Sequence, residues 1–157
     1  MRISHLLALA GFSVFMTGAA EAQDYGPSIN FVQAKEVLAA AEAEAAKQNF
    51  TVAIAIVDTS GKLVAFSKGD NTQTASVEVS EAKAVSAVSF KRSTKAFQDT
   101  VAGGGVGLRV LTLPGVVAAE GGVPLVVDGA IIGAIGVSGM TSEQDGIVAA
   151  AGVAALD

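Results

Sequence analysis

Apolar positions change their spacing along the chain, and these changes mark the expected helices and strands. Apolar residues at helical spacing predict a helix from Ser28, whose hydroxyl can cap it, to about Gln48. The β-branched run Val52–Val57 and the apolar run Lys62–Ser67, joined by the turn Asp58–Gly61, predict a β-hairpin. The positions that define the helical stripe are Phe31, Ala34, Leu38, Ala41 and Ala45.

The middle of the chain is expected to be helical and then irregular. Helices are predicted over Val79–Phe90 and Ser93–Thr100. The glycine-rich stretch Val101–Gly107 lacks the Lys-Ser/Thr ending of a P-loop and does not complete a GxGxxG motif. It is therefore interpreted as a flexible loop and not as a phosphate-binding site.

The last third of the chain predicts a second hairpin and a final helix. Strands are expected over Val123–Val127 and Ala130–Ser138, because Asp128-Gly129 between them suits a two-residue turn with positive φ angles. Thr141 is expected to open the last helix, with Gln144 as its capping-box partner.

The order of elements is helix, hairpin, helices, hairpin, helix. Strands that come as adjacent antiparallel pairs favour an α+β fold over a doubly wound parallel sheet. The expected domain organisation is a leader over residues 1–22, a flexible lead-in over 23–27 and one domain over 28–157.

The first 22 residues have the pattern of a secretory signal peptide. Arg2 and His5 form a short basic start, an apolar stretch runs from Leu6 to Ala20, and Ala20-Glu21-Ala22 matches the small-x-small cleavage pattern. The apolar stretch is short for a membrane span, which needs about 20 residues. The expected location is therefore periplasmic or extracellular, with cleavage before Gln23; an anchoring N-terminal helix is the alternative.

Composition excludes several classes of function. The 157-residue chain contains no cysteine, and its one histidine, His5, lies in the expected leader, so a mature chain would lack thiol chemistry, histidine-dependent triads and histidine-ligated metals. No metal site is expected. A net charge of -5 with 5% aromatic residues also makes nucleic acid a poor partner.

The final helix indicates a protein partner. No charged residue occurs from Gly146 to Leu156, and a helix that is apolar all round must be covered on every side. We expect a homo-oligomer formed through this C-terminal helix; a helix sandwiched inside one chain is the alternative. No membrane contact is expected after leader cleavage.

Several stretches resemble the GlcG/HbpS family of haem-binding or haem-degrading domains. These stretches are Val52–Ala65, Ala82-Lys83-Ala84 with Phe90 and Thr94, Glu120–Pro124, Asp128-Gly129, Ile132–Gly139 and Glu143–Asp145. The sequence departs from the family at Lys68-Gly69-Asp70, where the family usually carries Arg-Met-Asp, and at Met140, where a small residue is common.

The resemblance implies a single α+β domain with an antiparallel sheet of about five strands and helices packed on it. It also implies homo-oligomers, and haem binding in some members. Others are associated with glycolate metabolism or related to corrinoid-handling domains.

Lys83, Glu120 and Asp145 are the candidate catalytic residues. A desolvated Lys83 ammonium would suit proton transfer or capture of a carboxylate, whereas a salt bridge or a snorkelled stem is the structural alternative. Glu120 could act as a base or pair with Lys83, or it could be a solvated residue in a tight turn. Asp145 lies in the expected first turn of the last helix, where it is also favourable through the helix dipole.

Lys83, Gly121, Gly122, Ser138 and Met140 are the candidate cofactor-binding residues. Two adjacent glycines leave backbone N–H groups available as donors. Ser138 has no histidine to activate it, so the sequence does not point to a serine hydrolase.

Haem would be held mainly by apolar contact in this chain. Met140 and Tyr25 are the conventional iron ligands left among the side chains after residue 22. The cations expected to meet the propionates are Lys83, Lys91, Arg92 and Arg109.

Three hypotheses for the function therefore remain, and the last of them is a purely structural or accessory oligomer. The first is an exported protein that binds haem or a related tetrapyrrole. The second is a carboxylate-binding protein or a metal-free acid/base enzyme that uses Lys83, Glu120 and Asp145.

Overall fold

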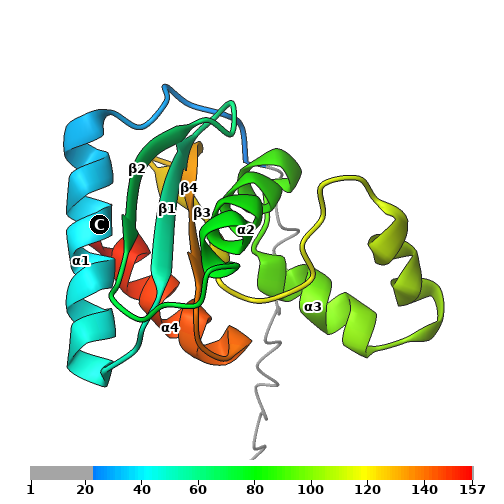
Figure 1. Cartoon of the computed structure of the whole chain (residues 1–157). Helices are drawn as coiled ribbons and strands as arrows, with labels where there is room; N and C mark the ends of the chain where they lie inside the picture. The colour runs from blue at the N-terminus through cyan, green and yellow to red at the C-terminus, as the bar shows by residue number, and fades with distance from the viewer. Residues whose placement is uncertain (1–22, 157) are drawn as a thin grey trace, which may run out of the picture.

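The computed structural model of the chain describes residues 23–156, and the expected leader, Met1–Ala22, lies outside the described residues. Helices and strand pairs follow one another in the predicted order (Figure 1). The elements are α1 (Phe31–Gln48), β1 (Ala53–Asp58), β2 (Leu63–Lys68), α2 (Ser76–Phe90), α3 (Thr94–Ala102), the 3-10 helix η1 (Gly105–Thr112), β3 (Gly122–Val127), β4 (Ala130–Ser138), α4 (Ser142–Val153) and the 3-10 turn η2 (Ala154–Leu156).

The described residues form one antiparallel sheet in the order β2-β1-β4-β3. This confirms the α+β class, but the sheet has four strands where about five were expected. The segment closest to a fifth strand is the lead-in, which makes only a single parallel bridge between Tyr25 and Ile131. Pro124 is tolerated in β3 because β3 lies at the sheet edge, where one side of the strand makes no ladder bonds.

Helices cover both faces of the sheet. Figure 1 shows α1 and α4 on one face and α2 on the other, with α3 and η1 reaching away from the body. Each face has its own apolar core, and β1 is therefore apolar along almost its whole length. Among residues 23–156 no helix combines the length and apolar character needed to cross a membrane.

Several boundaries differ from the sequence prediction. Asn30, and not Ser28, caps α1, because its side chain accepts the N–H groups of Val32 and Gln33 while the Ser28 hydroxyl hydrogen-bonds to that of Thr59. The stretch 101–107, expected to be a loop, instead closes α3 and opens η1.

Two local predictions of the last third are confirmed. Asp128 and Gly129 both have positive φ angles, 50° and 78°, as the two-residue turn requires. Thr141 caps α4, and the Thr141–Gln144 capping box is complete.

The lead-in 23–27 makes contacts with the body. Backbone hydrogen bonds join Asp24 and Gly26 to Ile131 of β4, and the Tyr25 hydroxyl donates to the carbonyl of Val88 over 2.8 Å. The lead-in is thus joined by hydrogen bonds to both the sheet and α2.

The last helix is largely covered by its own chain. α4 packs against α1, β4 and β3, and Val148, Ala149 and Gly152 are buried there. Ile147 remains 44% exposed. An oligomer interface through this helix stays a prediction, restricted to its outer side.

Asp58 organises the turn between β1 and β2. One carboxylate oxygen accepts hydrogen bonds from the Ser60 N–H at 2.8 Å, the Ser60 hydroxyl at 2.7 Å and the Lys62 N–H at 3.0 Å. The Ser60 hydroxyl and the Lys62 N–H hold the pKa of Asp58 below its ordinary value of 3.8.

Replacing Asp58 with Ala is expected to lower the free energy of unfolding by at most about 1 kcal/mol at pH 7, because the turn is open to solvent. A lowered folded-state pKa stabilises the fold above pH 3.8, and this stabilisation is lost as the pH falls through the folded value. Urea unfolding at pH 7 and pH 2.5 measures the difference, with the exposed Asp70→Ala as the control. An equal loss at both pH values would contradict the assignment.

Candidate functional site

A buried ion pair connects Lys83 of α2 with Asp145 in the first turn of α4. The Lys83 ammonium donates to Asp145 Oδ2 at 2.8 Å and to the carbonyl of Val137 in β4 at 2.9 Å. Asp145 Oδ1 accepts the N–H of Met140 at 3.0 Å. Each charged side chain is 3% exposed. The pair therefore joins a helix on one face of the sheet to a helix on the other.

Burial raises the pKa of the Asp145 carboxyl, and the hydrogen bonds from Lys83 and Met140 act in the opposite direction. The net direction is upward, so the lost hydration of the carboxylate outweighs its new partners. Removing two charges from water is costly, and this cost can exceed the attraction between them.

The two glycines after Glu120 make room for Lys83. Gly121 has a φ of 126°, and a Cβ atom there would lie 2.5 Å from the Val137 carbonyl oxygen and 3.0 Å from Lys83 Nζ. A Cβ at Gly122 would lie 2.4 Å from the Lys83 carbonyl oxygen. The Gly122 N–H donates to the Thr94 hydroxyl at 2.9 Å. The motif thus has a packing role around the ion pair.

Glu120 lies beside α4 and is not the ion-pair partner of Lys83. A Cβ atom at Gly146 would come within 2.3 Å of Glu120 Oε1, so the carboxylate rests against the backbone of α4. The Glu120 N–H donates to the Gln98 side chain at 2.9 Å. Roles in catalysis for Lys83, Glu120 and Asp145 stay predictions.

The remaining candidate side chains contact other parts of the protein. The buried Ser138 hydroxyl donates to that of Ser76 at 3.3 Å. The Met140 sulfur accepts a hydrogen bond from the Thr51 hydroxyl at 3.9 Å, and the Met140 side chain packs against the core. No group of three His, Cys, Asp or Glu side chains suited to a metal ion occurs within residues 23–156.

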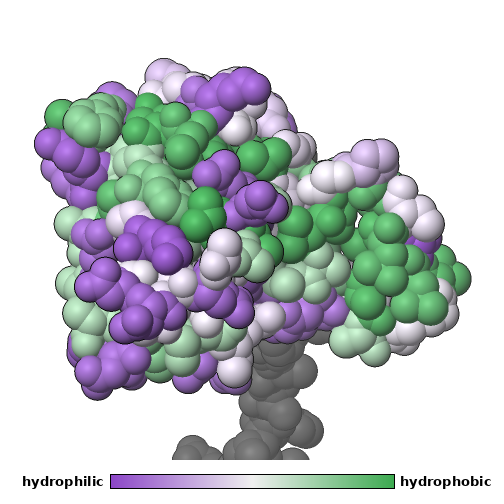
Figure 2. All heavy atoms as spheres, in the orientation of Figure 1, coloured by the Kyte–Doolittle hydropathy of each residue, from purple (hydrophilic) through white to green (hydrophobic). Residues whose placement is uncertain are grey.

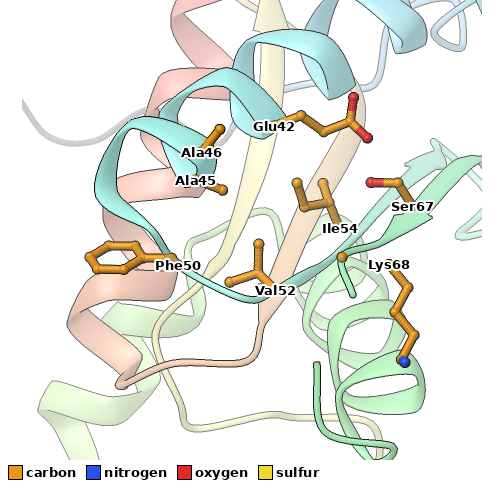
Figure 3. A pocket seen from close by; sticks show the side chains of 9 residues that line it. Glu42, Ala45, Ala46, Phe50, Val52, Ile54, Ser67 and Lys68 are labelled. Carbon is orange, nitrogen blue, oxygen red and sulfur yellow. The ribbon is translucent and has the colours of Figure 1, made fainter. Parts of the chain in front are cut away.

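Two pockets occur elsewhere in the described fold, and neither is lined by the candidate residues. One, here named the α1–β2 pocket, has a volume of about 240 Å³ (Figure 3). The other, of about 320 Å³, lies between the start of α1 and the β3–β4 turn. The α1–β2 pocket is lined by Glu42, Ala45, Ala46, Phe50, Val52, Ile54, Ser67, Lys68 and Gly69.

Two cations lie over aromatic rings where α2 ends. Lys91 Nζ is 4.4 Å from the centre of the Tyr25 ring, and the Arg92 guanidinium carbon is 5.5 Å from the centre of the Phe97 ring. Phe90 and Phe97 form an edge-to-face pair with centres 5.4 Å apart. We name this set of five residues the α2–α3 corner. The sequence offered Lys91 and Arg92 only as separate cations, because the Tyr25 ring beside Lys91 comes from a distant segment of the chain.

Replacing Lys83 with Met is expected to destabilise the protein by about 3–5 kcal/mol, because it leaves the Asp145 carboxylate buried without its cation. The double variant K83M/D145N should lose less, since it removes both charges and keeps an acceptor for the Met140 N–H. The deficit of K83M should shrink as the pH falls and the carboxyl becomes protonated. Urea unfolding followed by circular dichroism measures these differences.

The matched control is Lys95→Met, which breaks an exposed ion pair with Asp99 whose side chains are 50% and 59% exposed. This substitution should leave the stability close to that of the wild type, because water screens an exposed pair. A K83M variant as stable as K95M would show that the buried pair contributes nothing to the fold.

Solved structures resemble the chain over most of its length. A crystal structure described as a PduOC:heme complex has 30% sequence identity and a TM-score of 0.74, covering 83% of this chain and 96% of that one. A double mutant of HbpS from Streptomyces reticuli has 25% identity and a TM-score of 0.76, covering 99% of both chains.

Sequence comparisons agree with the structural ones. Protein GlcG of Escherichia coli strain K12 is 42% identical over 105 residues, which are 67% of this chain and 77% of GlcG. The model of the family described as "Haem degrading protein HbpS-like" matches residues 29–154. The chain therefore belongs to the HbpS-like family.

Proposed function

We propose that this chain is an exported protein that binds haem or a related tetrapyrrole as its cargo. Membership of the HbpS-like family supports this, as does the fold shared with a relative described as a haem complex. The observation that carries the proposal on this chain is the pair of adjacent cations over aromatic rings at the α2–α3 corner.

The side chains present suit the periphery of a haem better than its iron. Residues 23–157 contain no His or Cys. The Tyr25 hydroxyl donates to Val88, and the Met140 sulfur interacts with Thr51. The α1–β2 pocket, at about 240 Å³, is smaller than the roughly 300–1,000 Å³ typical of ligand sites, and the other pocket, at about 320 Å³, is at the lower end of that range. We therefore expect a flat ring to lie on the surface.

The α2–α3 corner offers groups that suit both the apolar ring and the anionic propionates of such a ligand. The 44% exposed Tyr25 and the half-buried Phe90 offer an apolar surface for a planar macrocycle, whereas Phe97 is buried beneath Arg92. Lys91 and Arg92 are consecutive in sequence, so their two charges can each meet one propionate. Lys83 is unsuited to this role because it is buried and paired with Asp145.

Reversing both charges in the double variant K91E/R92E is expected to weaken haemin binding about five- to thirtyfold, as expected for the loss of two solvent-exposed charge pairs. Haemin titration of the purified protein, followed in the Soret band, measures the affinity. The matched control is K35E/K62E, which reverses two exposed lysines elsewhere, one of them 5.2 Å from the centre of the Phe31 ring. Equal binding by the K91E/R92E and K35E/K62E variants would refute this location.

Iron-free protoporphyrin IX tests the way in which the ring is held. If apolar contact and the propionates dominate, it should bind within about threefold of haemin, and Tyr25→Phe should leave the ratio unchanged. A haemin preference above about tenfold that disappears in Tyr25→Phe would instead identify Tyr25 as an iron ligand.

Export is the second part of the proposal, and it is supported by the pattern of residues 1–22. The mature chain is expected to begin at Gln23. Intact-mass measurement of protein expressed from the full gene in a Gram-negative host, after osmotic release of the periplasm, tests this. A product that still carries Met1–Ala22 would contradict the proposal.

A further inference from the structure

Apolar side chains are concentrated on the segment that follows α3. We name residues 103–117 the arm; it contains η1 and the turn after it. Figure 2 shows hydrophobic side chains gathered over this projecting part of the molecule. The exposed members are Val106 at 78%, Leu108 at 49%, Leu111 at 64% and Leu113 at 43%. Monomeric proteins seldom expose such a cluster unless it forms an interface.

The arm has little attachment to the body of its own chain. η1 packs chiefly against α3, and Figure 1 shows both reaching away from the sheet. Val110 is the buried residue of η1, at 7% exposure. The exposed leucines are therefore not needed to hold the arm in place, and they remain available to a partner.

The charge of the arm indicates which kind of partner it can bind. Arg109 is the only charged residue in the arm, it is exposed, and it forms no ion pair with any other described residue. The whole chain has a net charge of -5, so an arm that combines leucines with one cation is complementary to the rest of the molecule.

The α1–β2 pocket has the matching features. Its floor is apolar, formed by residues such as Val52 and Ile54. Figure 3 shows the carboxylate of Glu42 and the hydroxyl of Ser67 at one end, with the Lys68 amino group directed away from them. Glu42 is exposed and, within residues 23–156, has no ion-pair partner.

We propose that the arm of one copy of this chain binds in the α1–β2 pocket of a second copy. Leu108 or Leu111 covers the apolar floor, and Arg109 pairs with Glu42. The arm cannot fill the pocket of its own chain, because the arm lies beyond α2 while the pocket lies between α1 and β2 on the opposite side of the sheet (Figure 1).

A charge exchange tests the contact directly. In haem-free protein, the wild type is expected to sediment as an oligomer, and R109E and E42R should each weaken association at least about tenfold. The double variant E42R/R109E should restore association to within about threefold of the wild type. Analytical ultracentrifugation over a range of concentrations measures the association constants.

Two further variants complete the design. Leu111→Asp should dissociate the oligomer while leaving the melting temperature of the subunit unchanged, because Leu111 is exposed. Glu36→Arg reverses an exposed charge on α1 outside the pocket and should have no effect.

Three outcomes would overturn the proposal. The first is a monomeric wild type, and the second is an oligomer that the Leu111→Asp and Arg109→Glu variants leave intact. The third is an oligomer that arm variants dissociate but Glu42→Arg does not, which would place the arm on another surface. Since no haem is present, failure of the proposed ligand would not affect these results.

Discussion

The ion pair between Lys83 and Asp145 is the interaction on which the arrangement of layers depends. Among residues 23–156 it is the one ion pair that joins side chains from opposite faces of the sheet, and Val137 of the central strand β4 takes part through its carbonyl. A pair this deeply buried gains little free energy over an apolar contact, but it tolerates few alternative arrangements, because a displaced ammonium would be left without partners. Its main effect is to specify how α2 and α4 are placed relative to the sheet.

The backbones of α2, β3 and β4 lie close together around this ion pair, and this close packing fixes the position of α2 on the sheet. A Cβ atom at Gly136 would lie 2.0 Å from the Ser80 carbonyl oxygen, and one at Gly122 would lie 2.4 Å from the carbonyl of Lys83. The middle of α2, around Ser80 and Lys83, therefore lies directly on the backbones of β3 and β4. A side chain at either glycine would push the helix outward and take the Lys83 ammonium away from Asp145.

Local signals predicted much of the fold, because a turn or a cap involves residues close together in sequence. Asp128-Gly129 and the Thr141–Gln144 box are of this kind. Asn30 replaced Ser28 as the cap of α1 because Ser28 hydrogen-bonds to Thr59, 31 residues away. The pairing of Lys83 with Asp145, rather than with Glu120, depends on how two helices cross the sheet. The α1–β2 pocket and the α2–α3 corner likewise combine segments whose proximity no local pattern encodes.

The glycines at the base of the arm have a mechanical consequence. Gly104 and Gly105 have φ angles of 66° and 54°, and a Cβ atom at either would meet nothing within 4 Å. The space around these two glycines is open, whereas α2 is fixed to the sheet by contacts with no spare room. At Gly107 the packing is close again, because a Cβ atom there would lie 2.1 Å from the Thr100 carbonyl oxygen. The two left-handed glycines therefore set the direction in which η1 leaves α3, and η1 and α3 form one unit beyond the sheet.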